Sequence, residues 1–184
     1  FDPVVSVTVY GRTINSGAID TAGGDIKLNG DPDGSDPGGA GATVITLRGD
    51  LDTTNDGGVA TAGAITVQSA DNDDVVELNA GGAGVTLFTD AGTTDGAITL
   101  NLPVEDNASN EEALTLNAGT GGNVTVNNTI GISDVIALLT LIGNNVHFEA
   151  NSEAAGIRVT CSSSIGLDDN NTGNSVTLDV NGVE

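Results

Sequence analysis

Residues 65–67 read Ile-Thr-Val, and this apolar-Thr-apolar unit recurs along the whole chain. Successive side chains of a β-strand point to opposite faces, so the two outer residues face one way and the central residue faces the other. The central position also accepts Lys, Glu, His and Arg, whereas the outer positions hold only Val, Ile, Leu or Phe. The units therefore predict short strands that bury their outer residues and expose the central one. The copies begin at residues 7, 26, 45, 65, 76, 85, 98, 114, 124, 139, 146, 157 and 176.

The spacing of these units indicates how the strands are arranged. The units at 7, 26, 45, 65 and 85 follow one another at almost equal steps, and the unit at 176 follows the one at 157 at the same interval. A repeat of this length with two or three short strands is typical of a β-solenoid, in which each coil adds one strand to every parallel sheet. We therefore expect one all-β domain over residues 1–184, a parallel β-solenoid with coils of about 19–20 residues and roughly nine coils. An antiparallel sandwich is the alternative, because it also places strands about ten residues apart.

Two segments interrupt the repeat. Residues 102–112 contain Pro103 and a run of acidic residues, which predicts a loop that leaves the solenoid. Residues 130–138 are irregular, and Ser133 is placed to cap a short helical turn there.

The composition excludes several classes of protein. The 26 acidic and 4 basic residues give a formal net charge of −22, which repels nucleic acid and anionic membranes. No apolar run is long enough to span a membrane, so membrane insertion is not expected. The single cysteine, Cys161, allows no disulfide within the chain and lies on the inward phase of its strand.

The acidic residues cluster between the strand units. Such clusters are typical of solvated turns, but they also suit divalent cations or a high-salt habitat. Asp31, Asp33 and Asp36 surround Gly34, a residue that permits a sharp turn, and together they form a candidate Ca²⁺ site. The ligand set lacks the distal Glu of an EF-hand loop. Ca²⁺ is the one cofactor that the sequence suggests.

The sequence contains no arrangement of residues that predicts catalysis. The outward-facing bases Lys27 and Arg158 are far apart, the acidic residues lie in turns, and His147 occupies an outward position. We therefore expect a non-catalytic protein. Asn107, in an Asn-Ala-Ser sequon on the predicted loop, is the most accessible candidate for glycosylation.

Two longer stretches resemble a known family. Residues 17–30, and residues 114–126 with the segments 130–141 and 144–148 after them, resemble the degenerate repeats of filamentous-haemagglutinin-like bacterial surface proteins. This resemblance implies a right-handed parallel β-helix, secretion to the cell surface or beyond, and a role in adhesion, in a biofilm matrix or in building filaments.

Both ends of the chain carry strong strand patterns and no polar cap, and a solenoid without caps exposes open strand edges. We therefore predict an extracellular structural subunit that assembles end to end into a homopolymer, by stacking coils or by strand addition. The alternative is a rod segment of a large adhesin that binds a glycan or a cell-surface receptor through its loops. The residues predicted to form the assembly contacts are Val5, Val7, Val9, Val176, Leu178 and Val180.

Overall fold

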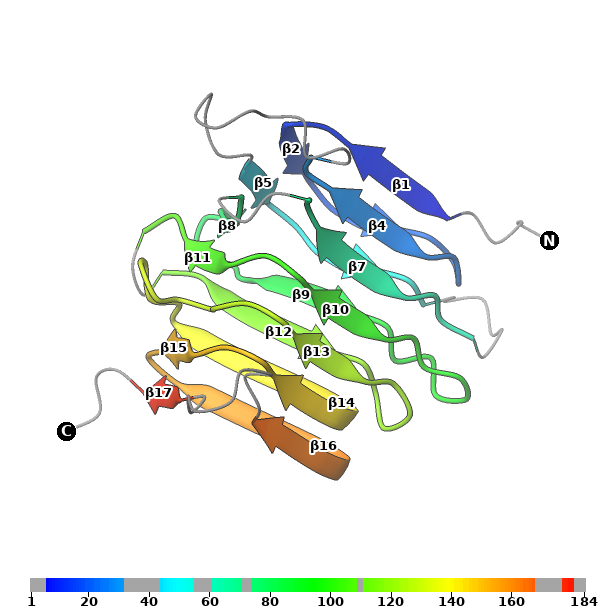
Figure 1. The fold of residues 1–184 in the computed structure, drawn as a ribbon. Helices are drawn as coiled ribbons and strands as arrows, with labels where there is room; N and C mark the ends of the chain where they lie inside the picture. Colours follow the sequence, from blue (N-terminus) through cyan, green and yellow to red (C-terminus); the bar gives the residue numbers. More distant parts are fainter. Residues whose placement is uncertain are drawn as a thin grey trace.

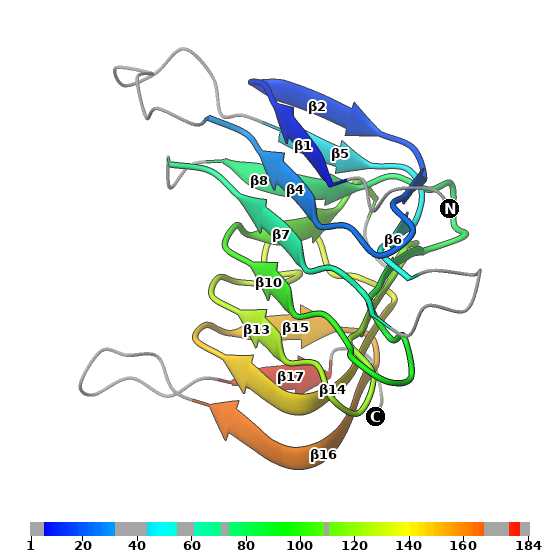
Figure 2. The same ribbon diagram turned by 90° about the vertical axis from the view of Figure 1, so that its right-hand side faces the viewer.

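The computed structural model describes residues 6–31, 44–54, 61–70, 74–108, 111–167 and 177–180. Over these ranges the regular secondary structure consists of β-strands, without a helix. Each pair of neighbouring strands is parallel. The chain visits three faces in turn and then returns to the first, so that each coil lies on the one before it (Figures 1 and 2). The fold is therefore all-β and parallel β-solenoid-like, as the strand units predict.

Each face is a stack of strands from successive coils. The first face contains β1 (Val7–Tyr10), β4 (Ile26–Asn29), β7 (Ile65–Gln68), β10 (Ile98–Leu100) and β13 (Val124–Val126). The second face contains β2 (Thr13–Ser16), β5 (Val44–Leu47), β8 (Val75–Leu78), β11 (Val104–Asp106), β15 (Ser152–Ala154) and β17 (Leu178–Val180). The third face contains β3 (Ile19–Asp20), β6 (Leu51–Asp52), β9 (Val85–Phe88) and β12 (Ala113–Asn117).

Two long strands, β14 (Leu138–Phe148) and β16 (Ile157–Leu167), belong to two faces at once. Their first halves extend the third face, where β14 pairs with β12, and their second halves extend the first face, where β14 pairs with β13. The pairing of β14 with β16 shifts register between Gly143 and Asn145, where the strands pass the corner. The first and third faces are therefore one continuous 11-stranded sheet.

The core consists of columns of aliphatic side chains that run along the solenoid. On the first face one column passes from Ile26 through Ile65, Ile98 and Val124 to Val146, each of them 0% exposed. The central residues of the same strands point outward and stack into a second column, in which Thr66 is in register with Lys27 and Thr99. The alternation predicted from the sequence therefore holds on this face; on the second face the central residue Thr46 is buried.

The coil length varies more than the regular repeat in the sequence predicts. Along the first face Val7 pairs with Ile26, and then Ile65, Ile98, Val124, Val146 and Ile165 follow in register. The step in sequence from Ile26 to Ile65 is twice as long as the step from Val7 to Ile26, and the later steps shorten again toward the last coil.

The predicted coil length is therefore correct only for the first and last of these coils. The units at 45 and 85 lie on the second and third faces. The steps from 26 to 45, from 45 to 65 and from 65 to 85 therefore connect strands that do not pair with each other. The coils differ in length because the loops that connect the strands lie at the surface and tolerate insertions.

The two irregular segments also differ from expectation. Residues 104–106 form β11 within the predicted loop of 102–112, because Val104 is in register with the buried Val76 of the coil before. Residues 130–137 form bends and isolated bridges rather than a helical turn. Ile130 bridges both Val104 and Ser152 and so continues the second face.

The corner before the first face is built from glycine. A Cβ on Gly63 would lie 2.3 Å from the backbone of Gly24, one on Gly96 would lie 1.9 Å from the carbonyl oxygen of Gly63, and one on Gly122 would lie 2.1 Å from that of Gly96. Successive coils thus touch backbone to backbone at this corner, and only glycine fits. Two buried threonines support the corner, since the hydroxyl of Thr53 donates to the carbonyl of Gly63 and that of Thr89 to the carbonyl of Gly96, at 2.7 and 2.8 Å.

Candidate functional site: an acidic hollow and the ends of the solenoid

The acidic residues of the turns hold neighbouring coils together. The carboxylate of Asp25 accepts a hydrogen bond from the backbone N–H of Ala64 at 2.8 Å, and that of Asp50 accepts one from Thr86 at 2.7 Å. In both pairs the partner lies in the next coil and is distant in sequence. A carboxylate that accepts a backbone N–H forms a charge-assisted hydrogen bond, which is stronger than a neutral one. Part of the negative charge therefore has a structural role.

Two buried carboxylates also accept backbone N–H groups, Asp106 from the segment that follows it and Glu112 from another coil. Asp106 points inward, in register with Leu78, and is 2% exposed. Its two oxygens accept the backbone N–H groups of Ala108, Glu111 and Glu112. Glu112, 0% exposed, accepts those of Gly82 and Gly84 at 2.9 and 3.1 Å. Buried charges of this kind are tolerated only because backbone donors replace water.

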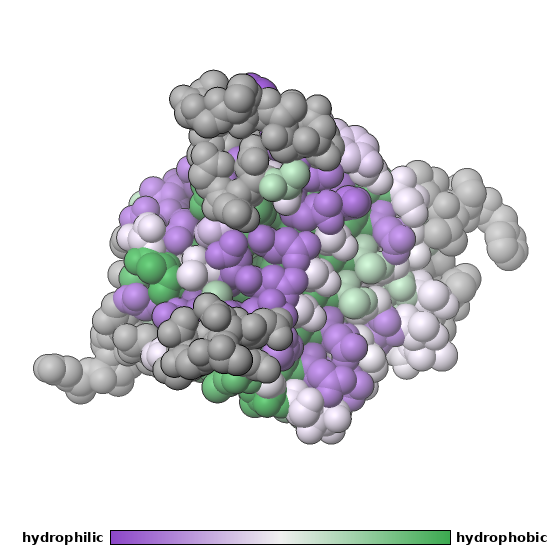
Figure 3. Space-filling view, viewed as in Figure 1, coloured by the Kyte–Doolittle hydropathy of each residue, from purple (hydrophilic) through white to green (hydrophobic). Residues whose placement is uncertain are grey.

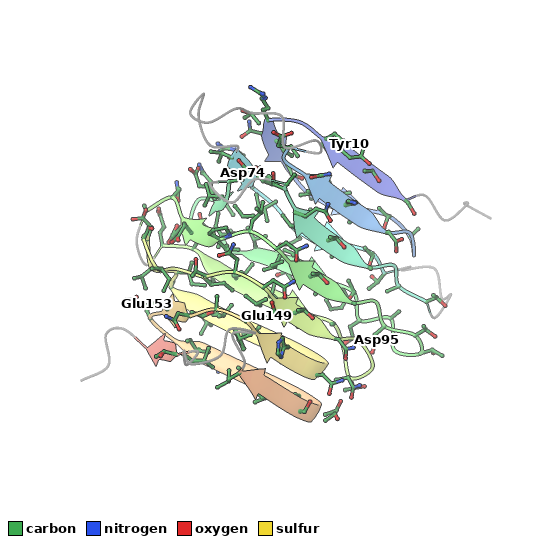
Figure 4. The ribbon with its side chains drawn as sticks, in the orientation of Figure 1. Tyr10, Asp74, Asp95, Glu149 and Glu153 are labelled. Atoms are coloured by element: carbon green, nitrogen blue, oxygen red, sulfur yellow. The ribbon has the colours of Figure 1, made fainter. Side chains whose placement is uncertain are left out.

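A hollow of about 390 Å³ opens on the second face between β8, β11 and the segment before β14. Glu77 and Glu105 are in register on adjacent coils there, so two carboxylates of the same sign are neighbours. Asp74 and Glu153 both lie on the side of the molecule that carries the second face (Figure 4). Five carboxylate-bearing residues belong to the lining, which consists of Asp74, Val75, Glu77, Pro103, Glu105, Asp106, Ser133 and Asp134.

Glu105 of β11 lines this hollow. Its carboxylate accepts the backbone N–H groups of Ser133 and Asp134 at 3.0 and 2.9 Å. Burial raises the pKa of Glu105, the negative charges of Asp134 and Glu153 raise it further, and the two backbone hydrogen bonds lower it in part. The arrangement attracts cations and basic side chains. Within the described ranges, however, no group of three or more His, Cys, Asp or Glu side chains is arranged to hold a metal ion.

The predicted Ca²⁺ site lies mostly outside the described residues. Asp31 is buried at the end of the coil that contains β4, and its backbone N–H donates to the hydroxyl of Ser69 at 3.0 Å. Asp33 and Asp36 fall in a range that the structure does not describe. The prediction of Ca²⁺ binding at these residues therefore stays a prediction.

The other chemically reactive side chains lie apart from the hollow. His147 points outward on the first face, with its Nε2 3.5 Å from the Oε1 of Glu149, and its ring lies over Gly166 of the next coil. Cys161 is half-buried against the core, on the inward phase that the sequence predicts. Asn107 is exposed directly after β11, as the glycosylation prediction requires.

The predicted assembly residues that the structure describes lie at the two ends of the solenoid. Val7 and Val9 belong to β1, which pairs only with β4 among the described strands, and both side chains are half-buried. Leu178 belongs to β17, which ends the second face. The backbone of Val180 is in the same strand, while Val5 and Val176 lie outside the described residues.

Sequence reasoning missed the two most exposed apolar residues of the C-terminal end. Ile165 and Leu167 are in register with the fully buried Val146 and Phe148, yet each is 49% exposed, because no described strand covers them on the other side. The signal was present: Ile165-Gly166-Leu167 is the same apolar-x-apolar unit with Gly in the central position. These residues belong to the core columns but lie at the surface.

Polar residues also form columns on the exterior. The side-chain amide of Asn127 donates to Asn101 at 2.6 Å, and that of Asn145 donates to Asn123 at 2.9 Å. Hydrophilic residues are prominent on the side of the molecule shown in Figure 3. These contacts follow the solenoid axis, so they add a polar connection between coils to the apolar one inside.

Comparisons with known proteins give no identity for the chain: no family model, curated protein or solved structure matches it. None of the described residues forms a helix of the length and hydrophobicity needed to cross a membrane.

Proposed function

We propose that this chain is a non-catalytic, extracellular structural unit that assembles end to end into a surface filament or matrix fibre. The observation that carries the proposal is the exposure of Ile165 and Leu167, because core columns that are 0% exposed at Val146 and Phe148 continue uncovered into the last coil. Single exposed apolar residues are ordinary on protein surfaces, but here they are in-register members of the core.

The architecture supports the same function. A stack of parallel strands has unpaired N–H and C=O groups at its two terminal strands, which favour pairing with another chain. The carboxylates in the turns add negative charge around the coils, which opposes side-by-side contact and favours growth along the axis. We propose further that the coils wind as a right-handed β-helix, since crossovers between parallel strands are right-handed in about 98% of cases.

The experiment is size-exclusion chromatography with light scattering, followed by negative-stain electron microscopy, with Ca²⁺ and with a chelator. We expect a mass that increases with protein concentration and rods longer than one monomer. Ca²⁺ or high salt should promote lateral association by screening the acidic surface. A protein that stays monomeric at every concentration and in both buffers would contradict the proposal.

The acidic hollow favours a second candidate function, a rod segment of a larger adhesin that binds a receptor or glycan. Glu77, Glu105 and Asp134 line a concave site of sufficient volume to receive a basic group of a partner. In this case the protein would be monomeric, and a Glu105→Lys variant would lose partner binding while keeping its fold.

A further inference from the structure

The strands that end the first face lie in stretches of chain without acidic residues. Residues 6–19 contain no Asp or Glu and one cation, Arg12; residues 154–167 contain no Asp or Glu and one cation, Arg158. The stretch between them, residues 20–153, contains 21 of the 26 acidic residues. The other five, Asp2, Asp168, Asp169, Asp179 and Glu184, lie outside both stretches. In a protein of net charge −22, contact between the two acid-free stretches therefore sets no carboxylate of one against a carboxylate of the other.

The apolar residues at the two ends also correspond. β16 ends both the first and the third face, and it carries Ile165 and Leu167 at 49% exposure. At the other end β1 carries Val7 and Val9 in the same two columns of the first face, both half-buried. The first and last coils of the first face are also its shortest.

From these observations we infer that the C-terminal end of one copy stacks on the N-terminal end of a second copy, with the strand register of the solenoid continued across the contact. Ile165 then lies over Val7, and Leu167 over Val9, on the first face. On the third face Val159 lies over Ile19, because these two residues end one column that runs through Leu51, Leu87, Leu116 and Leu141. The inference rests on the proposed function and adds the partner surface and its register.

The polar residues fit the same register. Ser164 continues the outward column of Asn123 and Asn145, and its hydroxyl donates to Asn145 at 2.7 Å. At the opposite end the column begins with Ser6, whose hydroxyl accepts the backbone N–H of Asp25 at 3.2 Å. In the stack Ser164 meets Ser6, so at this position a hydroxyl faces a hydroxyl and the pair buries no charge.

Two charged residues on the strands of this contact have opposite signs. Asp20 is the one acidic residue of β1, β2 and β3, and Arg158 is the one charged residue of β16. Continuing the register places Asp20 beside Thr160, two residues from Arg158 on the same outward side. The contact is head to tail, so it does not close on itself unless the coils curve, and repeating it gives a filament.

Cysteine cross-linking tests the register. In a Cys161→Ser background, Ser6→Cys and Ser164→Cys are made as separate proteins, mixed, oxidised mildly and separated on a non-reducing gel. Neighbouring parallel strands place their Cα atoms about 4.8 Å apart, which is within the range of a disulfide. We expect this mixture to yield at least about ten-fold more disulfide dimer than a control mixture of Ser6→Cys with Thr99→Cys. Thr99 lies in the middle of the same face.

Sedimentation velocity of the unmodified protein and of two variants accompanies the cross-linking. Leu167→Asp should weaken self-association by at least about ten-fold, and Thr99→Asp should leave it unchanged, with circular dichroism confirming that both are folded. Self-association without the Ser6–Ser164 cross-link, or unaffected by Leu167→Asp, would overturn the inferred contact and leave end-to-end assembly by strand addition. A wild-type protein that does not self-associate would overturn both the contact and the proposed function.

Discussion

The fourth and seventh coils of the first face use the same columns but differ in enclosure. In the fourth coil Ile98 and Leu100 are 0% and 2% exposed, because coils lie on both sides of them. In the seventh coil Ile165 and Leu167 occupy the same columns and are each 49% exposed. The apolar pattern decides which side chains point inward. Whether those side chains are buried depends on the neighbouring coils, and this difference separates the interior of the solenoid from its ends.

The largest expected effect comes from truncating one apolar residue in each region. Leu116→Ala, at a position 0% exposed, should lower the free energy of unfolding by about 2–5 kcal/mol, because it leaves a cavity between coils. Leu167→Ala should lower it by about 1 kcal/mol or less, since solvent already reaches the side chain. Urea denaturation of both variants, followed by circular dichroism at low protein concentration, measures the difference. Equal losses would contradict the distinction between interior and end.

A second comparison tests the close approach of backbones in the middle coils. Gly96→Ala would place a methyl group 1.9 Å from the carbonyl oxygen of Gly63, so the two coils must move apart. The expected cost is about 1–3 kcal/mol, as for other overpacked sites. Gly17→Ala, in the first coil, is the control, because its added Cβ would meet no atom within 4 Å. Thermal unfolding should show a lower midpoint for Gly96→Ala alone.

The third comparison extends the distinction between enclosed and exposed positions to the acidic residues. Glu112→Ala removes the acceptor for the backbone N–H groups of Gly82 and Gly84, which should cost about 1–3 kcal/mol. The adjacent Glu111 is exposed, so Glu111→Ala should change stability by about 0.5 kcal/mol or less. Chemical denaturation at pH 7 compares the two variants. A similar effect of both would show that the buried carboxylate is not structural.

The smallest effect concerns pH and the acidic hollow. Burial raises the pKa of Glu105, so the folded protein holds the Glu105 proton to higher pH than the unfolded chain does. Glu105 is therefore most favourable to stability below its unfolded pKa, and that contribution is lost as pH rises through the folded pKa. The difference in melting temperature, Glu105→Gln minus wild type, should increase from about pH 4.5 to pH 7. A constant difference across this range would show that the hollow does not penalise the charge.

Several features of the fold could be predicted from sequence because they depend on local alternation. The apolar-x-apolar units locate strands such as β7 and β10, and they identify Ile65 and Ile98 as inward-facing. The outward positions of His147 and Arg158 follow from the same alternation. The period of two residues along a strand is set by the backbone, so it needs no knowledge of neighbouring coils.

Coil length and the candidate site could not be predicted in this way. The hydrogen bond from Thr53 to Gly63 and the equivalent one from Thr89 to Gly96 span different numbers of residues. No fixed spacing in the sequence therefore identifies this corner. Glu77 and Glu105 are distant in sequence and become neighbours only through the pairing of β8 with β11. Variable connections between strands remove the sequence signal for both features.

The sequence by itself determined the strands, their inward and outward faces and the acidic surface, because each depends on residue type and on a two-residue period. The tertiary structure alone decided which strands stack, and with that the three faces, the glycine corner and the acidic hollow. It also decided that Ile165 and Leu167 are exposed while Val146 and Phe148 are buried. The physical reason is that burial depends on the coils that lie on either side of a residue, and those coils are distant along the chain and separated by connections of variable length.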